Sequence, residues 1–228
     1  MLLFLHGALY TKREFEPLMA ALADQFTLDA IDFTGHGGEM MPAEPYSIQL
    51  FADDVLRWME RSGCAKADIF GFSMGGYVGL YLARHYPERV GRLMTLGTKL
   101  RWNPETSARE VKMLDPEKIE QKVPHFAEVL KHRHGGDRWK KVLEKTAEMM
   151  VNLGDSPELP YEEFQQIEQA VRLSLGDRDH MVSIEETIEA YRQLPTGELA
   201  ILPGTGHPLE SIPVDYLCTE ITRFFTVA

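Results

Sequence analysis

Cysteine is scarce in this sequence. Cys64 and Cys218 are the only two, both stand in segments with helical periodicity, and they lack the spacing of metal ligands. We therefore expect both thiols to pack as ordinary side chains in a reducing compartment. We expect no metal site and no cofactor.

Long apolar runs are also missing. No stretch of about 18 consecutive apolar residues occurs, which excludes a membrane-spanning helix. The apolar start at residues 1–5 stops at His6-Gly7 and has neither the basic flank nor the length of a signal peptide. By default, these absences predict a cytoplasmic location.

Positive charge is in deficit. The chain has 24 Lys and Arg against 35 Asp and Glu, a net charge of −11. Such an excess of acid disfavours a nucleic-acid backbone or an anionic membrane as the partner. We expect a small-molecule substrate instead, bound by a monomer or a homodimer.

What is present is typical of a globular α/β protein. Hydrophobic residues make up 44% and charged residues 26%, and 228 residues are enough for one domain with an insertion but few for two. Short apolar segments that read as strands alternate with helical segments. The expected strands cover residues 2–5, 27–31, 68–70, 93–96, 171–175 and 199–202. This alternation predicts a mostly parallel sheet of six strands, flanked by helices on both faces, with ligands at the carboxyl ends of the strands.

The helical segments have recognisable ends. A helix is expected around residues 15–25, and another at residues 48–62, where Ser47 can cap the start and Gly63 the end. Residues 99–169, between the fourth and fifth strands, show helical periodicity and no clear strand. We therefore expect a helical cap at 99–169, inserted into a core made of residues 1–98 and 170–228.

The motif that organises the chain is GFSMG at residues 71–75. Between a strand and a helix, a GxSxG sequence makes a sharp turn that lifts the serine hydroxyl above the sheet edge. Gly71 and Gly75 keep this crowded corner free of Cβ atoms. Ser73 is therefore the candidate nucleophile.

A serine nucleophile needs a base that is itself oriented by a third group. Asp179 follows the fifth expected strand and His207 follows the sixth, so both should lie at the same sheet edge as Ser73. Asp177 competes for the role of the acid, but we expect it to be a solvated turn residue. We expect His6 and His36 to fix loops by hydrogen bonding. The histidines expected at the surface are His85, His125, His132, His134 and His180.

Five motifs, in this order, resemble the α/β-hydrolase superfamily over nearly the full chain. They are LFLHG at residues 3–7, DFTGHGG at 32–38, GFSMGG at 71–76, GDRDHMV at 176–182 and PGTGH at 203–207. The resemblance implies the α/β-hydrolase fold, with Ser73 as nucleophile, Asp179 as orienting acid and His207 as general base. It also implies an oxyanion hole made by the backbone N–H groups of Ala8 and Met74. The family's usual sheet has two further strands before the HG motif, so six strands are expected here instead of eight.

Two activities fit these motifs. The first is a serine hydrolase that cleaves a small carboxylic ester or related acyl compound through an acyl-serine intermediate. The alternative is a triad-dependent lyase or C–C bond enzyme similar to 2-succinyl-6-hydroxy-2,4-cyclohexadiene-1-carboxylate synthase. That anionic substrate would need basic groups in the pocket, and the possible suppliers are Lys99, Arg101, Arg109, Lys112 and Arg178. Because the first residues of the cap leave the fourth strand near Ser73, Trp102 and Arg101 are the expected substrate-binding residues. A non-catalytic binding protein on this fold is disfavoured by the presence of all three triad residues.

Overall fold

The computed structural model describes residues 1–226. Its centre is one six-stranded sheet in the order β2-β1-β3-β4-β5-β6, and every neighbouring pair of strands is parallel. The strands are β1 (Leu2–Leu5), β2 (Leu28–Ile31), β3 (Ala67–Phe72), β4 (Val90–Leu96), β5 (Val171–Gly176) and β6 (Gly197–Leu202). The expected six-stranded parallel sheet is confirmed, and several strands are longer than their apolar runs suggested.

The two faces of the sheet carry separate cores because side chains alternate along a strand. Within β1, Leu3 and Leu5 belong to one buried cluster, and Leu2 and Phe4 belong to the other. All four side chains are at most 2% exposed. The central strands are therefore apolar on both faces, as expected for a parallel sheet covered by helices on both sides.

Helices α1 (Glu16–Leu22) and α9 (Val214–Phe225) cover one face, and α2 (Ile48–Ser62), α3 (Met74–His85) and α8 (Ile184–Tyr191) cover the other. Three short 3-10 helices, η1 (Lys12–Phe15), η2 (Pro87–Arg89) and η4 (Leu209–Ser211), connect these elements. The helix expected near residues 15–25 thus begins as η1 and ends earlier than anticipated.

The bounds of α2 agree with the sequence. The Ser47 side chain accepts a hydrogen bond from the Leu50 amide at 3.0 Å, and Gly63 ends the helix with a left-handed φ of 66°. Both features were expected at these two residues, because a serine supplies an acceptor to the free first turn and a glycine adopts positive φ without strain.

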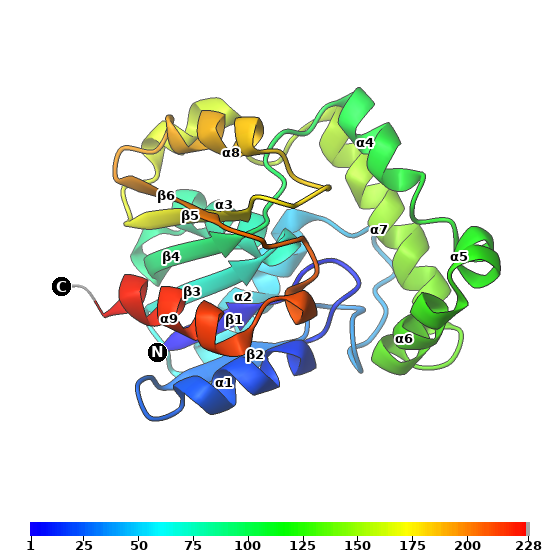
Figure 1. The fold of residues 1–228 in the computed structure, drawn as a ribbon, viewed down its shortest axis with the longest axis horizontal. Helices are drawn as coiled ribbons and strands as arrows, with labels where there is room; N and C mark the ends of the chain where they lie inside the picture. Colours follow the sequence, from blue (N-terminus) through cyan, green and yellow to red (C-terminus); the bar gives the residue numbers. More distant parts are fainter. Residues whose placement is uncertain (227–228) are drawn as a thin grey trace.

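Between β4 and β5 the chain leaves the sheet and forms four helices. These are α4 (Pro104–Val111), α5 (Pro116–Lys122), α6 (Pro124–His134) and α7 (Arg138–Asp155), followed by η3 (Tyr161–Gln166). Figure 1 shows α4 to α7, in green, gathered beside the sheet and apart from the helices that cover its faces. We call residues 99–169 the cap segment.

Side chains tie the cap segment to the core through backbone groups. Glu158 accepts hydrogen bonds from the amides of Ile48 and Gln49 at 2.8 and 2.9 Å, which satisfies the first turn of α2. Lys145 on α7 donates to the Glu44 carbonyl at 2.7 Å. Within residues 1–226, none of the helices has both the length and the apolar character needed to cross a membrane.

Candidate active site

Ser73 stands at a strained corner between β3 and α3. Its backbone has φ 51° and ψ −116°, a conformation that non-glycine residues rarely adopt. Its amide donates to the Leu96 carbonyl at 2.8 Å, and its carbonyl accepts from Thr98 Oγ1 at 3.0 Å. Strain of this kind persists only where neighbouring contacts fix it, and here both contacts come from the end of β4 and the residues just after it.

The glycines around Ser73 are required by space. A Cβ atom on Gly75 would lie 2.1 Å from the Leu5 carbonyl oxygen, and one on Gly71 would lie 2.5 Å from the Gly75 oxygen. Neither backbone contact can move aside cheaply. The GxSxG pattern therefore reflects close packing of α3 on β1 and β3.

Asp179 and His207 meet although 28 residues separate them. The His207 Nδ1 atom lies 2.7 Å from Asp179 Oδ2, and Asp179 Oδ1 accepts from the Met181 and Val182 amides at 2.8 and 2.9 Å. Burial raises the pKa of the Asp179 carboxyl, but the hydrogen bonds and the His207 ring outweigh it and hold that pKa below its usual range. An ionised Asp179 accepts the Nδ1–H of a neutral His207, which leaves Nε2 as the proton acceptor.

The competing acid, Asp177, lies elsewhere in the same loop. It is exposed, and its carboxylate accepts from the Thr205 amide at 3.2 Å. The contact with His207 is thus made by Asp179.

One narrow cavity of about 50 Å³ brings the candidate residues together. Ser73 and His207 line it, as do Ala8, Met74 and Trp102. Its other lining residues are mostly apolar: Ile48, Tyr77, Lys99, Glu110, Met149, Met150, Leu153, Met181 and Val182. Six of the lining residues lie between β4 and η3, so the cap segment forms a large part of the wall.

Two backbone amides beside Ser73 are free to donate. Ala8 and Met74 line the cavity, and within residues 1–226 no acceptor takes a hydrogen bond from either amide. Met74 is the first residue of α3, where amides have no partner inside the helix. Both residues of the expected oxyanion hole therefore line the same cavity as Ser73, and their amides have no acceptor among the described residues.

Arg101 does not occupy the position expected of a substrate-binding residue. Its guanidinium pairs with Glu189 on α8, and its side chain is 40% exposed. The Arg101 backbone amide donates to Glu186 Oε1 at 3.3 Å. Trp102, the neighbouring residue, does line the cavity.

The other basic residues also differ from an anion-binding pocket. Among the residues that the structure describes, Lys99 is the one Lys or Arg in the cavity wall, and it is paired with Glu110 and Glu186. Lys112 and Arg178 are exposed, and the Arg109 side chain is 65% exposed. Over the same part of the chain, no group of three or more His, Cys, Asp or Glu side chains is arranged to hold a metal ion.

His134 was expected at the surface, and this prediction was wrong. It is 1% exposed, its Nδ1 accepts from the Gly37 amide at 3.2 Å, and its Nε2 lies 3.1 Å from the Leu9 carbonyl oxygen. It thereby joins the end of α6 to the loop that holds Ala8. Leu9 itself has a strained φ of 65°, so this cap histidine supports the backbone next to the candidate oxyanion hole.

Two further histidines lie nearby: His36 packs against His134, and His6 packs against His36. The His36 ring lies 5.7 Å from that of His134 and 5.1 Å from that of His6, measured between ring centroids. His6 Nε2 accepts from the Phe33 amide at 3.1 Å, the loop-fixing role expected for it. The burial of His134 was missed because its polar partners lie about 100 residues away in the sequence, so no local pattern indicated it.

A parallel six-stranded sheet with a strained serine elbow and an acid–histidine pair at the strand ends defines the class of α/β-hydrolase folds. The family model described as alpha/beta hydrolase fold matches residues 1–144. The chain belongs to this family.

Among curated proteins, the chain is similar to a putative carbamate hydrolase RutD of Caulobacter segnis, with 33% identity over 90 residues. It is also similar to a pimeloyl-[acyl-carrier protein] methyl ester esterase of Neisseria meningitidis serogroup C, with 36% identity over 89 residues. Each match covers 39% of this chain and 34% or 33% of the relative. The matching regions thus cover about a third of the length of these curated relatives.

Solved structures match over almost the whole chain. The enol-lactonase from Burkholderia xenovorans LB400 superposes with a TM-score of 0.80 at 20% identity, covering 99% of this chain and 91% of that one. An E-2-(acetamidomethylene)succinate hydrolase gives a TM-score of 0.78 at 21% identity, covering 100% and 91%. These likenesses show the shared fold.

Proposed function

We propose that this protein is a serine hydrolase that cleaves a small, mainly apolar carboxylic ester through an acyl-serine intermediate. The observation that carries the proposal is the convergence on one cavity of Ser73, of His207 hydrogen-bonded to Asp179, and of two free backbone amides. The curated relatives act on several kinds of acyl bond, which supports hydrolysis in general more than any one substrate.

In the proposed reaction, Nε2 of His207 takes the proton of the Ser73 hydroxyl as its oxygen attacks the substrate carbonyl carbon. The negative charge that develops on the carbonyl oxygen is held by the Ala8 and Met74 amides. The C–O bond of the ester then breaks, and His207 returns the proton to the leaving alcohol. Water attacks the acyl-serine in the same way and releases the carboxylic acid.

The apolar wall favours this reaction over the lyase alternative. An anionic elimination substrate needs unpaired cations, whereas Lys99 is already neutralised by two carboxylates and the other basic candidates do not line the cavity. A neutral ester needs no such partner. We therefore keep the small-molecule ester as the proposed substrate.

We further propose that residues 99–169 act as a cap over the active site, with residues 1–98 and 170–228 as the catalytic core. Trp102, Met149, Met150 and Leu153 support this division, because they supply apolar wall to a cavity whose reactive groups all come from the core. Covering the site in this way would exclude water from the acyl group and strengthen the electrostatic contacts within it.

The proposal is tested by offering the purified protein p-nitrophenyl acetate, butyrate and octanoate, and by labelling it with a fluorophosphonate. We expect turnover of at least one short ester and a single adduct on Ser73, located by mass spectrometry of peptides. If no ester is cleaved and Ser73 stays unlabelled, the proposal is wrong.

A further inference from the structure

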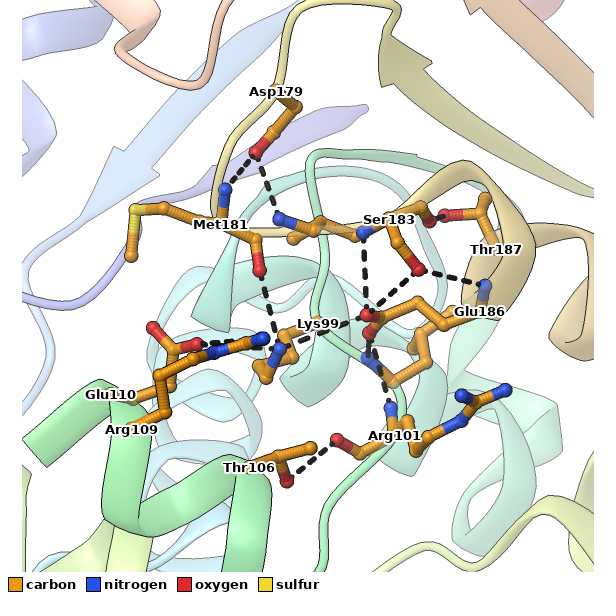
Figure 2. A network of polar contacts seen from close by, with 12 residues as sticks. Lys99, Arg101, Thr106, Arg109, Glu110, Asp179, Met181, Ser183, Glu186 and Thr187 are labelled. Atoms are coloured by element: carbon orange, nitrogen blue, oxygen red, sulfur yellow. Dashed lines mark hydrogen bonds and ion pairs between the residues drawn. The ribbon is translucent and has the colours of Figure 1, made fainter.

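Lys99 and Glu110 form a buried ion pair in the wall of the same cavity (Figure 2). The Lys99 Nζ atom lies 3.4 Å from Glu110 Oε1, and the side chains are 9% and 3% exposed. Both residues line the cavity together with Ser73. Because taking two charges out of water costs more than apolar packing would, a charged pair in an otherwise apolar wall needs a reason.

Neighbouring groups hold Lys99 in place. Its ammonium donates to the Met181 carbonyl at 3.2 Å and lies 3.7 Å from Glu186 Oε2. Glu186 is occupied elsewhere: Oε1 accepts from the Leu100 and Arg101 amides at 3.1 and 3.3 Å. Figure 2 shows Lys99 between Glu110 on one side and Glu186 on the other, below the Met181 carbonyl. The ammonium is thus fixed at the wall.

The pair retains unused hydrogen-bonding capacity. A lysine ammonium has three donors, and one of them makes a hydrogen bond, to the Met181 carbonyl. The Glu110 and Glu186 oxygens lie farther away, at 3.4 and 3.7 Å, which is longer than a well-formed hydrogen bond. Both cations near Glu110, Lys99 and Arg109, contact the same oxygen, Oε1. Within residues 1–226 no hydrogen bond to Glu110 Oε2 is present, so this acceptor and the weakly engaged Lys99 ammonium lie next to each other at the cavity wall.

We propose that the Lys99–Glu110 pair determines substrate specificity by binding an uncharged polar group of the ester, such as a primary carboxamide. The carboxamide oxygen would accept from Lys99 Nζ, and its NH₂ group would donate to Glu110 Oε2. This inference rests on the proposed ester hydrolysis and names the class of ester: an apolar chain that ends in a neutral group able both to donate and to accept.

The local charges explain why a neutral group fits better than an ion. A substrate carboxylate would reach Lys99 only by approaching Glu110 and Glu186, and a substrate ammonium would reach Glu110 only by approaching Lys99. Like charges held this close reject the wrong partner. An alkyl end would leave the pair's donor and acceptor unsatisfied, which also costs binding free energy.

Three methyl esters with the same arrangement of non-hydrogen atoms test this preference. Methyl 4-carbamoylbutanoate ends in a carboxamide, methyl 5-methylhexanoate replaces it with an isopropyl group of the same shape, and monomethyl glutarate replaces it with a carboxylate. A second series carries the same three terminal groups on the alcohol part of acetate esters. In at least one of the two series we expect kcat/KM for the carboxamide to exceed both others by about tenfold or more.

Two variants assign the preference to the pair. Glu110→Gln keeps the size but removes the negative charge beside Lys99, so the preference for carboxamide over carboxylate should fall about tenfold. Lys99→Met should remove most of the preference for carboxamide over isopropyl. The control is Lys141→Met with Glu144→Gln, an exposed pair on α7 that should leave every ratio unchanged. Each ratio comes from one preparation, so a loss of folded protein cancels.

The outcomes separate the two proposals. Cleavage of these esters with equal ratios in wild type and Glu110→Gln would overturn the role of the pair and leave ester hydrolysis standing. A wild-type preference for the isopropyl or carboxylate ester would overturn it as well. Failure to cleave any ester, with Ser73 unlabelled by a fluorophosphonate, would remove both proposals.

Discussion

The core and the cap segment contribute to the same cavity in different ways. The core supplies Ser73 and His207 to the cavity and Asp179 behind His207, each in a loop that follows a strand. The cap segment supplies wall, mostly apolar, from helices that reach the core through contacts between residues about 100 positions apart, such as Lys145 with Glu44 and His134 with Gly37. Reactivity is thus fixed by short turns, and pocket shape by long-range packing.

If this division is correct, changes in the core should reduce kcat, and changes in the cap segment should alter stability, pH dependence or substrate preference.

The largest effect should come from Ser73→Ala. We expect kcat to fall by about 10⁶, since removal of a triad serine has an effect of this size in related chemistry. Ester turnover by the purified variant measures it. The thermal midpoint should match that of the wild type, because the hydroxyl contributes little to packing; turnover above a thousandth of wild type in folded protein would contradict the assignment.

Asp179→Asn should reduce kcat by about 10⁴, because the amide can donate to Nδ1 and stabilise the wrong tautomer of His207. The matched control is Asp177→Asn, which alters an exposed carboxylate in the same loop. We expect that variant to keep activity within a few-fold. The opposite ranking in a pH-controlled ester assay would show that the acid has been wrongly assigned.

His134→Gln should make folding less sensitive to acid. Burial lowers the pKa of His134 from 6.5 to about 4. Well above pH 6.5 the ring is therefore neutral in both the folded and the unfolded chain. As the pH falls from 6.5 towards 4, the unfolded chain gains a proton that the folded chain does not, and stability is lost. For this histidine the loss between pH 7.5 and 4.5 is about 2.5 kcal/mol.

Urea unfolding at the two pH values measures this difference. The pH-dependent loss of unfolding free energy should be about 2.5 kcal/mol smaller in His134→Gln than in the wild type, although the variant starts less stable at pH 7.5. Burial also lowers the pKa of His6 and His36, so part of the acid sensitivity should remain. An equal loss in both proteins would mean that His134 titrates normally.

Met150→Ala should have the smallest effect and should act on selectivity. Met150 is half-buried on α7 and lines the cavity, so its truncation widens the wall without touching the triad. We expect the preferred acyl chain to lengthen, with a change of about tenfold in the ratio of kcat/KM for octanoate over butyrate. Val151→Ala, which changes a side chain 43% exposed on the same helix, is the control. If both variants alter the ratio equally, Met150 does not shape the pocket.

Much of the core was predictable because local rules govern it. Short apolar segments indicated the number of the strands and their places in the chain, Ser47 and Gly63 indicated the ends of α2, and the GxSxG spacing predicted the turn at Ser73. Each of these signals acts over a few residues, so it can be read without knowing what the segment packs against.

Other features were decided only when distant segments met. Arg101 and Lys99 are both basic residues at the start of the cap segment, yet one pairs with Glu189 at the surface and the other is buried between two carboxylates. Likewise, His132 and His134 stand two positions apart on α6, and only His134 is buried. The sequence by itself determined the sheet, the family and the candidate reactive residues, because these depend on local spacing. The tertiary structure alone decided which charges are neutralised and which side chains form the pocket, because burial and ion pairing depend on partners far away in the chain.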